Sequence, residues 1–322
     1  MIPRILVTGG SGLLGSHLLR WFLQNGYSNL TATYQHDEKV IPSDLREGIV
    51  WKKLRLPDIA DAFEVIQDQD WVIHSAGLVS YFKEDKFKLL DVNQKGTEHI
   101  VNACLAHDVK HLVYIGSIGA LGKEKNNVTL NESGDWIENQ FSTTYGLSKY
   151  LGELEVWRGA AEGLPVSVVL PSVILGTGDW SRSSLQLIDR IATKSPWYPG
   201  GQTGFVDVQD IVSFLSVLLE KSITGHRWLL SGGNMTYKEI YSQIASALQI
   251  NRSYTLAPRW LASIQLLAAN ILHGRYSTPD ILHQVYGTFS YDNTKSLGVE
   301  GFTYRPLSDS IRDMAAAYHN KK

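Results

Sequence analysis

The sequence has a single cysteine, Cys104, and no long apolar run. One cysteine can neither form a disulfide within the chain nor build a multi-thiolate metal site. A disulfide framework is therefore excluded, and a reducing compartment is compatible with the composition. No stretch reaches the roughly 20 consecutive apolar residues that a membrane-spanning helix needs, so we expect no membrane span.

A large charge of one sign is missing as well. The 30 lysine and arginine residues face 32 aspartate and glutamate residues, which gives a net charge of −2 over 322 residues. Nucleic-acid-binding proteins need a basic surface, and disordered chains are poor in hydrophobic residues, which here make up 43%. We therefore expect a globular protein of one or two domains that does not bind nucleic acid.

Two local features bear on location and on metals. The apolar segment 5–7 begins almost at the first residue and leads directly into a glycine-rich turn, which disfavours a signal peptide and favours a cytoplasmic protein. His74 ends another apolar segment without a Cys, Asp or Glu cluster beside it. We expect a packed histidine there and no metal site.

Short β-branched segments alternate with helical patterns as far as residue 172 or so. This alternation is typical of an α/β fold whose parallel sheet is doubly wound, with helices on both faces. The expected strands and long helices are 5–7, 30–34, 71–74, 111–115 and 166–170, and 13–24, 86–107 and 145–162.

The second half of the chain is less regular and richer in Gly, Ser, Trp and Pro. We predict that residues 173–322 form mainly a smaller, partly discontinuous substrate-binding domain. This domain is expected to return strands from about 204–222 and 286–292 to the main sheet. Asp210 is predicted to cap a following helix, and Thr236 has capping-box spacing to Glu239.

Three apolar features of this half are open to two interpretations. Trp180 and Trp197 can each line a pocket or pack in a core. The apolar stretch 260–272 has 13 residues, too few to cross a bilayer. For this stretch a buried helix or pocket wall is favoured over attachment to a membrane surface.

A glycine-rich turn stands between the first expected strand and the first expected helix. At this place in a βαβ unit, helix N-terminal amides bind a dinucleotide pyrophosphate, and glycines let the backbone approach the phosphates. The expected cofactor-binding residues of the turn are Thr8, Gly9, Ser11, Gly12, Leu13, Leu14 and Gly15.

The end of the second strand bears on which dinucleotide binds. An acidic residue there favours NAD, and an arginine favours NADP. This chain has Tyr34, Gln35 and His36 instead. An uncharged end tolerates a phosphate better than a carboxylate does, so NADP(H) is slightly favoured over NAD(H).

Tyr145 and Lys149 lie four residues apart and therefore on one face of a helix. A tyrosine is a poor acid or base at neutral pH unless a nearby cation stabilises its phenolate, and Lys149 is placed to do so. Ser117 ends the strand 111–115, at the edge of the sheet where ligands bind. Taken singly, Tyr145 and Lys149 are better explained as a solvated helix pair, and Ser117 as a simple strand terminator.

Together, in this order and spacing, the glycine turn, Ser117, Tyr145 and Lys149 resemble the extended short-chain dehydrogenases/reductases. This superfamily includes NAD-dependent epimerase/dehydratases and dihydroflavonol reductase-like enzymes, and the resemblance covers nearly the whole chain. It implies that residues 1–172 form a dinucleotide-binding Rossmann domain. It also implies that Tyr145 exchanges a proton with the substrate, that Lys149 lowers the tyrosine pKa and binds the nicotinamide ribose, and that Ser117 polarises the carbonyl.

The resemblance implies further cofactor contacts. Relatives often have an acidic residue near position 55 that holds the adenine, whereas this chain has Arg55. Asn93 has a structural role in relatives, and we keep both a structural and a cofactor-binding role open. The additional residues expected around the cofactor are Arg55, Leu56, Ala76, Gly77, Asn93, Pro171 and Ser172.

Three functions remain open: a ketone or aldehyde reductase, a nucleotide-sugar epimerase or dehydratase, and a non-catalytic dinucleotide sensor. The Ser-Tyr-Lys set disfavours the sensor. Sugar-nucleotide enzymes of the superfamily carry an asparagine and an arginine where this chain has Val173 and Gly204, which favours a small-molecule carbonyl substrate of apolar character. Arg182 and Arg190 are alternative partners for a diphosphate. The resemblance also implies a homodimer formed through helices 86–107 and 145–162.

Overall fold

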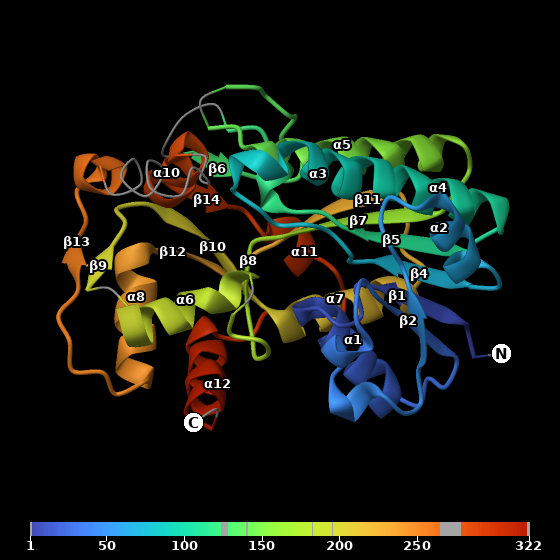
Figure 1. Cartoon of the computed structure of the whole chain (residues 1–322), viewed down its shortest axis with the longest axis horizontal. Coiled ribbons are helices and arrows are strands. Elements are labelled where there is room, and N and C mark those ends of the chain that lie inside the picture. Colours follow the sequence, from blue (N-terminus) through green and yellow to red (C-terminus); the bar gives the residue numbers. More distant parts are fainter. Residues whose placement is uncertain are drawn as a thin grey trace.

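The computed structural model describes residues 2–123, 128–139, 141–181, 183–194, 196–264 and 278–320. At its centre, seven parallel strands form a twisted sheet in the order β11-β7-β5-β4-β1-β2-β3 (Figure 1). Chain order reverses between β1 and β4, and ligands bind outside the carboxyl ends of the strands at such a point. The strands are β1 (Ile5–Thr8), β2 (Leu30–Tyr34), β3 (Val50–Lys53), β4 (Trp71–His74), β5 (His111–Ile115), β7 (Val166–Pro171) and β11 (His226–Leu230).

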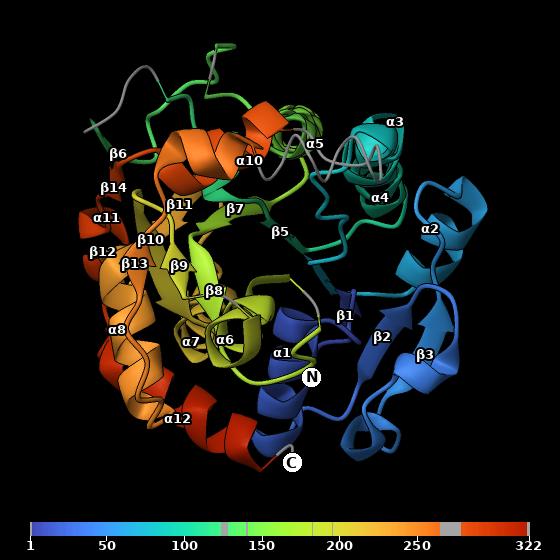
Figure 2. The ribbon, with the colours of Figure 1, turned by 60° about the vertical axis from the view of Figure 1, so that its left-hand side comes forward.

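Helices cover both faces of this sheet (Figures 1 and 2). On one face α2 (Ile59–Ile66), α4 (Gly96–Ala106) and α5 (Thr144–Ala161) pack side by side, and α3 (Lys86–Leu90) lies beside α5. On the other face α1 (Leu13–Gln24) packs against α7 (Val208–Glu220). Both faces of the inner strands are therefore buried, which explains their continuous apolar character. The predicted α/β, Rossmann-like, doubly wound fold is confirmed.

The second half of the chain adds three small sheets and a core of its own. The small sheets have the orders β12-β10-β8, β13-β9 and β14-β6. Their strands are β6 (Val128–Leu130), β8 (Val173–Leu175), β9 (Trp197–Tyr198), β10 (Gln202–Asp207), β12 (Gly233–Thr236), β13 (Thr255–Leu256) and β14 (Phe289–Tyr291). The accompanying helices are α6 (Gln186–Asp189), α8 (Tyr237–Ala247), α10 (Thr278–Tyr286), α11 (Thr294–Leu297) and α12 (Leu307–His319).

The strand pairing of this half differs from the expectation. β10 overlaps the expected region 204–222 and β14 lies within 286–292, but both belong to small sheets. The strand that returns to the main sheet is β11, which pairs with β7 in parallel. β10 cannot join the main sheet because its two edges already pair with β8 and β12. The division at residue 172 itself remains a prediction.

Two helix predictions also need correction. Asp207, not Asp210, caps α7, because its carboxylate accepts a hydrogen bond from the Gln209 amide at 2.6 Å while Asp210 already lies in the first helical turn. The helix expected over 86–107 is interrupted at 91–95 by one wide π-helical turn. The capping box of Thr236 and Glu239 is confirmed.

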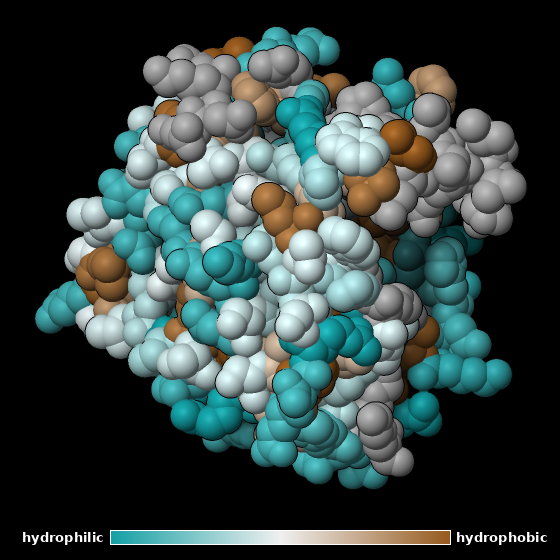
Figure 3. Space-filling model, turned by 90° about the vertical axis from the view of Figure 1, so that its left-hand side faces the viewer, coloured by the Kyte–Doolittle hydropathy of each residue, from teal (hydrophilic) through white to brown (hydrophobic). Residues whose placement is uncertain are grey.

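The two tryptophans have different surroundings. Trp180 is buried and packs edge-to-face on Tyr318, so it belongs to the core of the second half. Trp197 is 37% exposed. The face of the molecule shown in Figure 3 carries mainly hydrophilic and neutral residues around scattered apolar patches. In the stretch 260–272, Trp260 and Ile264 are exposed and residues 261–263 are half-buried, whereas residues 265–272 lie outside the described residues. Among the residues that the structure describes, no helix is long and apolar enough to cross a membrane.

Candidate active site

The glycine turn lies at the carboxyl end of β1, where the order of the sheet reverses. Gly9 has φ +68°, and a Cβ there would come within 2.9 Å of the Ala76 backbone. A Cβ on Gly15 would overlap the Gly9 carbonyl oxygen. These two glycines therefore allow α1 and the loop after β4 to approach the turn closely.

Gly12, in contrast, is exposed. A Cβ there would meet only the Gly9 oxygen, at 3.2 Å. The N-terminus of α1 has no side-chain cap and no acidic residue in its first turn. Ser11, Gly12, Leu13 and Gly77 line one cleft of about 1120 Å³ there. An uncapped helix start facing a cleft of this size fits a dinucleotide pyrophosphate. Leu14 is buried in the core, so only its backbone can face this ligand.

Thr8 and His74 belong to a buried chain of hydrogen bonds behind the turn. Thr97 donates its hydroxyl to the Asn93 carbonyl at 2.6 Å, so it accepts from Nε2 of His74 at 3.2 Å. His74 Nδ1 then accepts from the Thr8 hydroxyl at 2.8 Å, and Thr8 accepts from the Ala76 amide. Burial lowers the pKa of His74 to about 3. The packed, neutral histidine predicted from the sequence agrees with these contacts, and Thr8 acts here through its side chain as a support.

A carboxylate lies close to the end of β2, although no acidic residue stands at positions 34–36. The Tyr34 hydroxyl donates to the Glu38 carboxylate at 2.9 Å, and Gln35 is exposed beside it. Arg55 is held by Asp61 through two hydrogen bonds of 2.8 Å, and it points along the start of α2. Leu56 is buried against α4. None of these four predicted contact residues lines the 1120 Å³ cleft, and the charged groups around them are paired.

Asn93 fixes the loop that follows β4. Its side-chain oxygen accepts from the Leu78 amide at 2.7 Å, and its amide nitrogen donates to the Leu78 carbonyl and to Ser148 Oγ, each at 2.9 Å. The side chain is 1% exposed and fully engaged. These contacts favour the structural role of Asn93 over direct cofactor binding. The loop it holds contains Gly77, where a Cβ would lie 3.8 Å from Lys149 Nζ.

Ser117 and Tyr145 meet at the carboxyl end of β5. Ser117 accepts a hydrogen bond from the Gly119 amide at 3.0 Å and also bonds to the Tyr145 phenol. Tyr145 lies in the first turn of α5, which Thr143 caps. The ring of Tyr81 packs edge-on against that of Tyr145, with 6.2 Å between centroids. The structure thus brings the predicted serine and tyrosine together.

Lys149 lies one turn further along α5 and is 6% exposed. Its Nζ donates to the Ile115 carbonyl at 2.8 Å and lies 4.4 Å from the centroid of the Tyr114 ring. Burial lowers its pKa to about 7, and Glu153 opposes this change.

The lowered pKa expected for Tyr145 is not found. Burial raises the pKa of its phenol, and the hydrogen bond from Ser117 opposes that rise. The reason is that Lys149 directs its ammonium to a backbone carbonyl, so that desolvation dominates at the phenol. Tyr114, which supports Lys149, is a residue that the sequence did not reveal, because it lies within an apolar strand.

Pro171, Ser172 and Gly204 are buried at the carboxyl end of β7, where β10 of the second half lies against it. Ser172 bonds through its amide to the Leu230 carbonyl, which joins the end of β7 to β11. A Cβ on Gly204 would come within 2.9 Å of the Tyr291 ring and 3.0 Å of Ser172. A side chain as large as that of arginine therefore has no room at position 204.

The structure describes only one of the two arginines that are alternative partners for a diphosphate. Arg190 is exposed and acts electrostatically on Tyr237 and Tyr241 of α8, in the second half. Arg182 lies outside the described residues. In the part of the chain that is described, no group of three or more His, Cys, Asp or Glu side chains is arranged to hold a metal.

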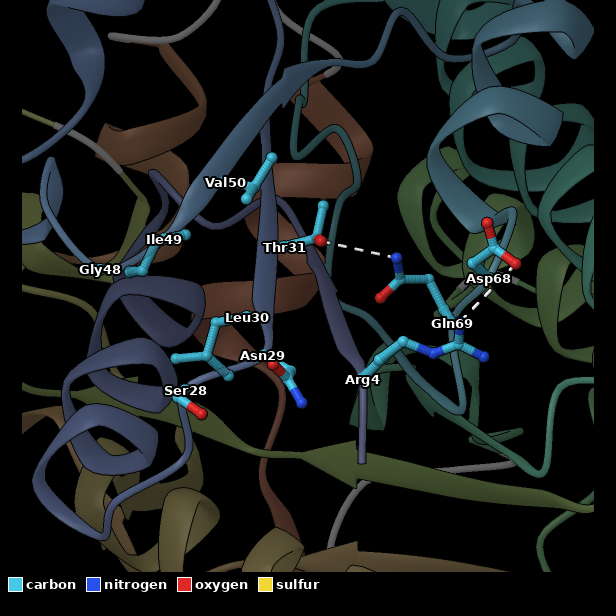
Figure 4. Close-up of a pocket in the computed structure, with 10 residues that line it drawn as sticks. All are labelled: Arg4, Ser28, Asn29, Leu30, Thr31, Gly48, Ile49, Val50, Asp68 and Gln69. Carbon is cyan, nitrogen blue, oxygen red and sulfur yellow. Dashed lines mark hydrogen bonds and ion pairs between the residues drawn. The ribbon is translucent and has the colours of Figure 1, made fainter. Parts of the chain in front are cut away.

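A second cavity, of about 510 Å³, lies at the opposite edge of the sheet. Figure 4 shows it at the amino ends of β2 and β3, where Gln69 bonds to Thr31 and Arg4 pairs with Asp68. None of the predicted site residues lines it. The 1120 Å³ cleft at the glycine turn is therefore the candidate cofactor site.

Fold and site together define a dinucleotide-binding protein of the extended short-chain dehydrogenase/reductase superfamily. The chain belongs to the NAD dependent epimerase/dehydratase family, whose model matches residues 5–230.

Curated relatives include several reductases. The chain is 28% identical to "Sterol demethylase protein B" of Methylococcus capsulatus, over 81% of this chain and 80% of the relative. It is 25% identical to "Putative dihydroflavonol 4-reductase" of Synechocystis, over 81% of this chain and 77% of the relative. It is 29% identical to "Tetraketide alpha-pyrone reductase 2" of Arabidopsis thaliana, over 73% and 79%.

Solved structures confirm the fold. The crystal structure of gox2253 matches with a TM-score of 0.84 at 22% identity, over 99% of this chain and 98% of that one. The Bordetella bronchiseptica enzyme WbmG, solved in complex with NAD and UDP, matches with a TM-score of 0.76 at 17% identity, over 99% and 95%.

Proposed function

We propose that this protein reduces a largely apolar ketone or aldehyde to an alcohol, or catalyses the reverse oxidation. The observation that carries this proposal is the contact of Ser117 with Tyr145 at the carboxyl end of β5, one helical turn from Lys149. A hydroxyl and a phenol that converge on one point can both bond to a carbonyl oxygen there.

Each residue of the site has a separate role in the proposed reaction. A bound nicotinamide dinucleotide supplies the hydride for reduction and accepts it in oxidation. Tyr145 donates its phenolic proton to the carbonyl oxygen as that oxygen gains charge, and Ser117 donates a hydrogen bond to the same oxygen. Lys149, in its charged form, stabilises the phenolate that remains until solvent returns a proton. Gly77 leaves room for the nicotinamide ribose beside Lys149.

The choice of substrate class rests on the second half of the site. A nucleoside diphosphate buried without a cationic partner costs several kcal/mol, and Gly204 has no room for the arginine that would supply one. Several relatives are named as reductases of aromatic or polyketide compounds. Both points favour an uncharged carbonyl compound.

For the cofactor we propose a slight preference for NADP(H) over NAD(H). Support comes from the absence of a carboxylate at position 34 and from Arg20 and Lys39, two cations that line the same cleft as the glycine turn. Arg20 is paired with Asp44, and Glu38 is bonded to Tyr34, so the preference is expected to be small. We further propose a homodimer and a cytoplasmic location.

A substrate panel tests the reductase proposal. The purified protein is incubated with NADPH or NADH and a set of aromatic and aliphatic ketones and aldehydes. Oxidation of the cofactor is followed as loss of the absorbance of the reduced nicotinamide. Parallel incubations with UDP- and dTDP-hexoses are analysed for new sugars. Cofactor consumption matched by one equivalent of alcohol supports the proposal, and a sugar product without net cofactor consumption contradicts it.

Nucleotide-sugar epimerisation is the second candidate. It is favoured by the family model and by solved neighbours in complex with UDP or UDP-sugars. For this function Arg190 is the described residue to test as a diphosphate partner. An Arg190→Ala variant is expected to lose binding of UDP only if this second candidate is correct.

A further inference from the structure

His17 lies in the second turn of α1, on the wall of the cofactor cleft, and is 9% exposed. Its Nε2 lies 2.9 Å from the Thr177 carbonyl oxygen, and its Nδ1 lies 2.9 Å from the side-chain nitrogen of Gln209. A carbonyl oxygen only accepts, and an amide nitrogen only donates. Both bonds therefore form together in the neutral imidazole that carries its proton on Nε2.

These two bonds join three parts of the molecule that are distant in sequence. His17 belongs to the helix that starts at the glycine turn, and Gln209 belongs to the first turn of α7. Thr177 follows β8, which pairs with β10 in the second half. The histidine therefore links the dinucleotide-binding helix directly to the substrate-binding half.

The segment that begins at Thr177 forms the opposite wall of the cleft. Thr177, Gly178, Asp179 and Ser181 line it together with Ser11, Gly12 and Leu13 of the glycine turn. A Cβ on Gly178 would lie 3.6 Å from the Leu13 side chain, so the segment comes close to the glycine turn and would contact it with any larger residue here. A change in the distance between His17 and Thr177 would change the width of the space left for the pyrophosphate.

We propose that His17 and Gln209 are positioning residues that hold segment 177–181 at the distance from α1 at which it closes on a bound dinucleotide. The proposal rests on the proposed function only in its assignment of the dinucleotide to this cleft. Binding of the dinucleotide therefore fixes the position of segment 177–181, and this segment in turn positions the substrate. His17 itself does not exchange a proton with the substrate.

The test measures dissociation constants rather than turnover. NADPH and NADH are titrated by calorimetry into the wild-type protein and into His17→Ala, Gln209→Ala and the double variant. At about 1.4 kcal/mol per tenfold change, the loss of two neutral hydrogen bonds of about 1 kcal/mol each predicts about 30-fold weaker binding for His17→Ala. Gln209→Ala, which loses one of the two bonds, is expected to weaken binding about fivefold. The double variant should bind no more weakly than His17→Ala, because both residues act through one contact.

A second measurement separates positioning from general damage. Hydrogen exchange of the amides in 177–181 is expected to quicken in both single variants, while exchange in β1 and β5 stays as in the wild type. His17→Gln, whose amide can still donate to the Thr177 carbonyl, should regain part of the affinity. Gln243→Ala, which changes an exposed glutamine on α8 that does not line the cleft, serves as control and should bind like the wild type.

Wild-type affinity in folded His17→Ala and Gln209→Ala, or unchanged exchange in 177–181, would overturn the proposal. If His17→Ala does not fold, Gln209→Ala decides alone, because Gln209 is exposed and its loss leaves the core intact. Failure of the reductase proposal is distinguishable, since it shows as a wild-type protein that binds the dinucleotide but reduces no ketone.

Discussion

Replacing Lys149 by methionine is expected to abolish catalysis and to make the free protein more stable. The lysine is 6% exposed, and burial lowers its pKa from 10.5 to about 7. The unfolded chain therefore binds a proton that the folded chain holds weakly, and this difference favours unfolding throughout the range below pH 10.5. Methionine has similar length and no charge to desolvate.

The magnitude follows from the two pKa values. At about 1.4 kcal/mol per pKa unit, burying this lysine costs about 4 kcal/mol of folding free energy at pH 7. Its hydrogen bond to Ile115 and its contact with Tyr114 offset about 1–2 kcal/mol of that cost. Lys149→Met should therefore unfold with a free energy about 2–3 kcal/mol higher than the wild type. Toward pH 10 the wild type approaches the variant, because the lysine then loses its proton in the unfolded chain as well.

Urea unfolding of both proteins at pH 7 and pH 10, without dinucleotide, measures the difference. Comparing the two proteins at each pH cancels the titration of all other groups. Lys238→Met, a change of an exposed lysine on α8, is the control, and its difference from the wild type should not depend on pH. A Lys149→Met protein that is less stable than the wild type at pH 7, or whose advantage does not shrink at pH 10, would refute the reasoning.

Four further outcomes are expected. Tyr145→Phe should lose 10²-fold to 10⁴-fold in turnover, as general acid–base catalysis contributes, and should bind dinucleotide like the wild type in calorimetry; near-normal turnover contradicts its assignment. Gly12→Leu, which places a side chain at the start of α1, should abolish dinucleotide binding in the same titration, whereas Gly26→Ala at the other end of α1 should not. Glu38→Gln should shift relative affinity toward NADPH over NADH, because it removes a carboxylate beside Tyr34; tenfold tighter binding of NADH to the wild type would overturn the proposed NADP(H) preference. If the dimer forms through α3, α4 and α5, Phe87→Asp should yield monomers in light scattering, since Phe87 is 81% exposed on α3; a monomeric wild type would exclude this interface.

Local patterns were sufficient to predict most of the first half. The strands 30–34, 71–74 and 111–115 have the predicted bounds, because each is a short apolar run that must be buried on both faces. β3 was not predicted, since its two lysines and exposed Val50 give it the pattern of an edge strand rather than of a core strand. The pairing of β11 with β7 depends on contacts between distant segments, which a local pattern does not contain.

The same limit applies to the site. Residue spacing was enough to predict that Tyr145 and Lys149 share a helix face. It could not show that Lys149 donates to Ile115, since that bond depends on how α5 packs over β5. His17 and Gln209 are 192 residues apart, and no sequence signal joins them.

The π-helical turn at 91–95 makes this stretch of the chain sensitive to changes in length. It accommodates one residue more than a continuous α-helix would, and Asn93 lies within it. Deleting any single residue here would return the stretch to a regular α-helix with both flanking segments close to their present positions, but the side chains within the turn would shift by one position. Asn93 could then no longer reach both Leu78 and Ser148. One-residue deletions in this turn are therefore expected to be eliminated during evolution.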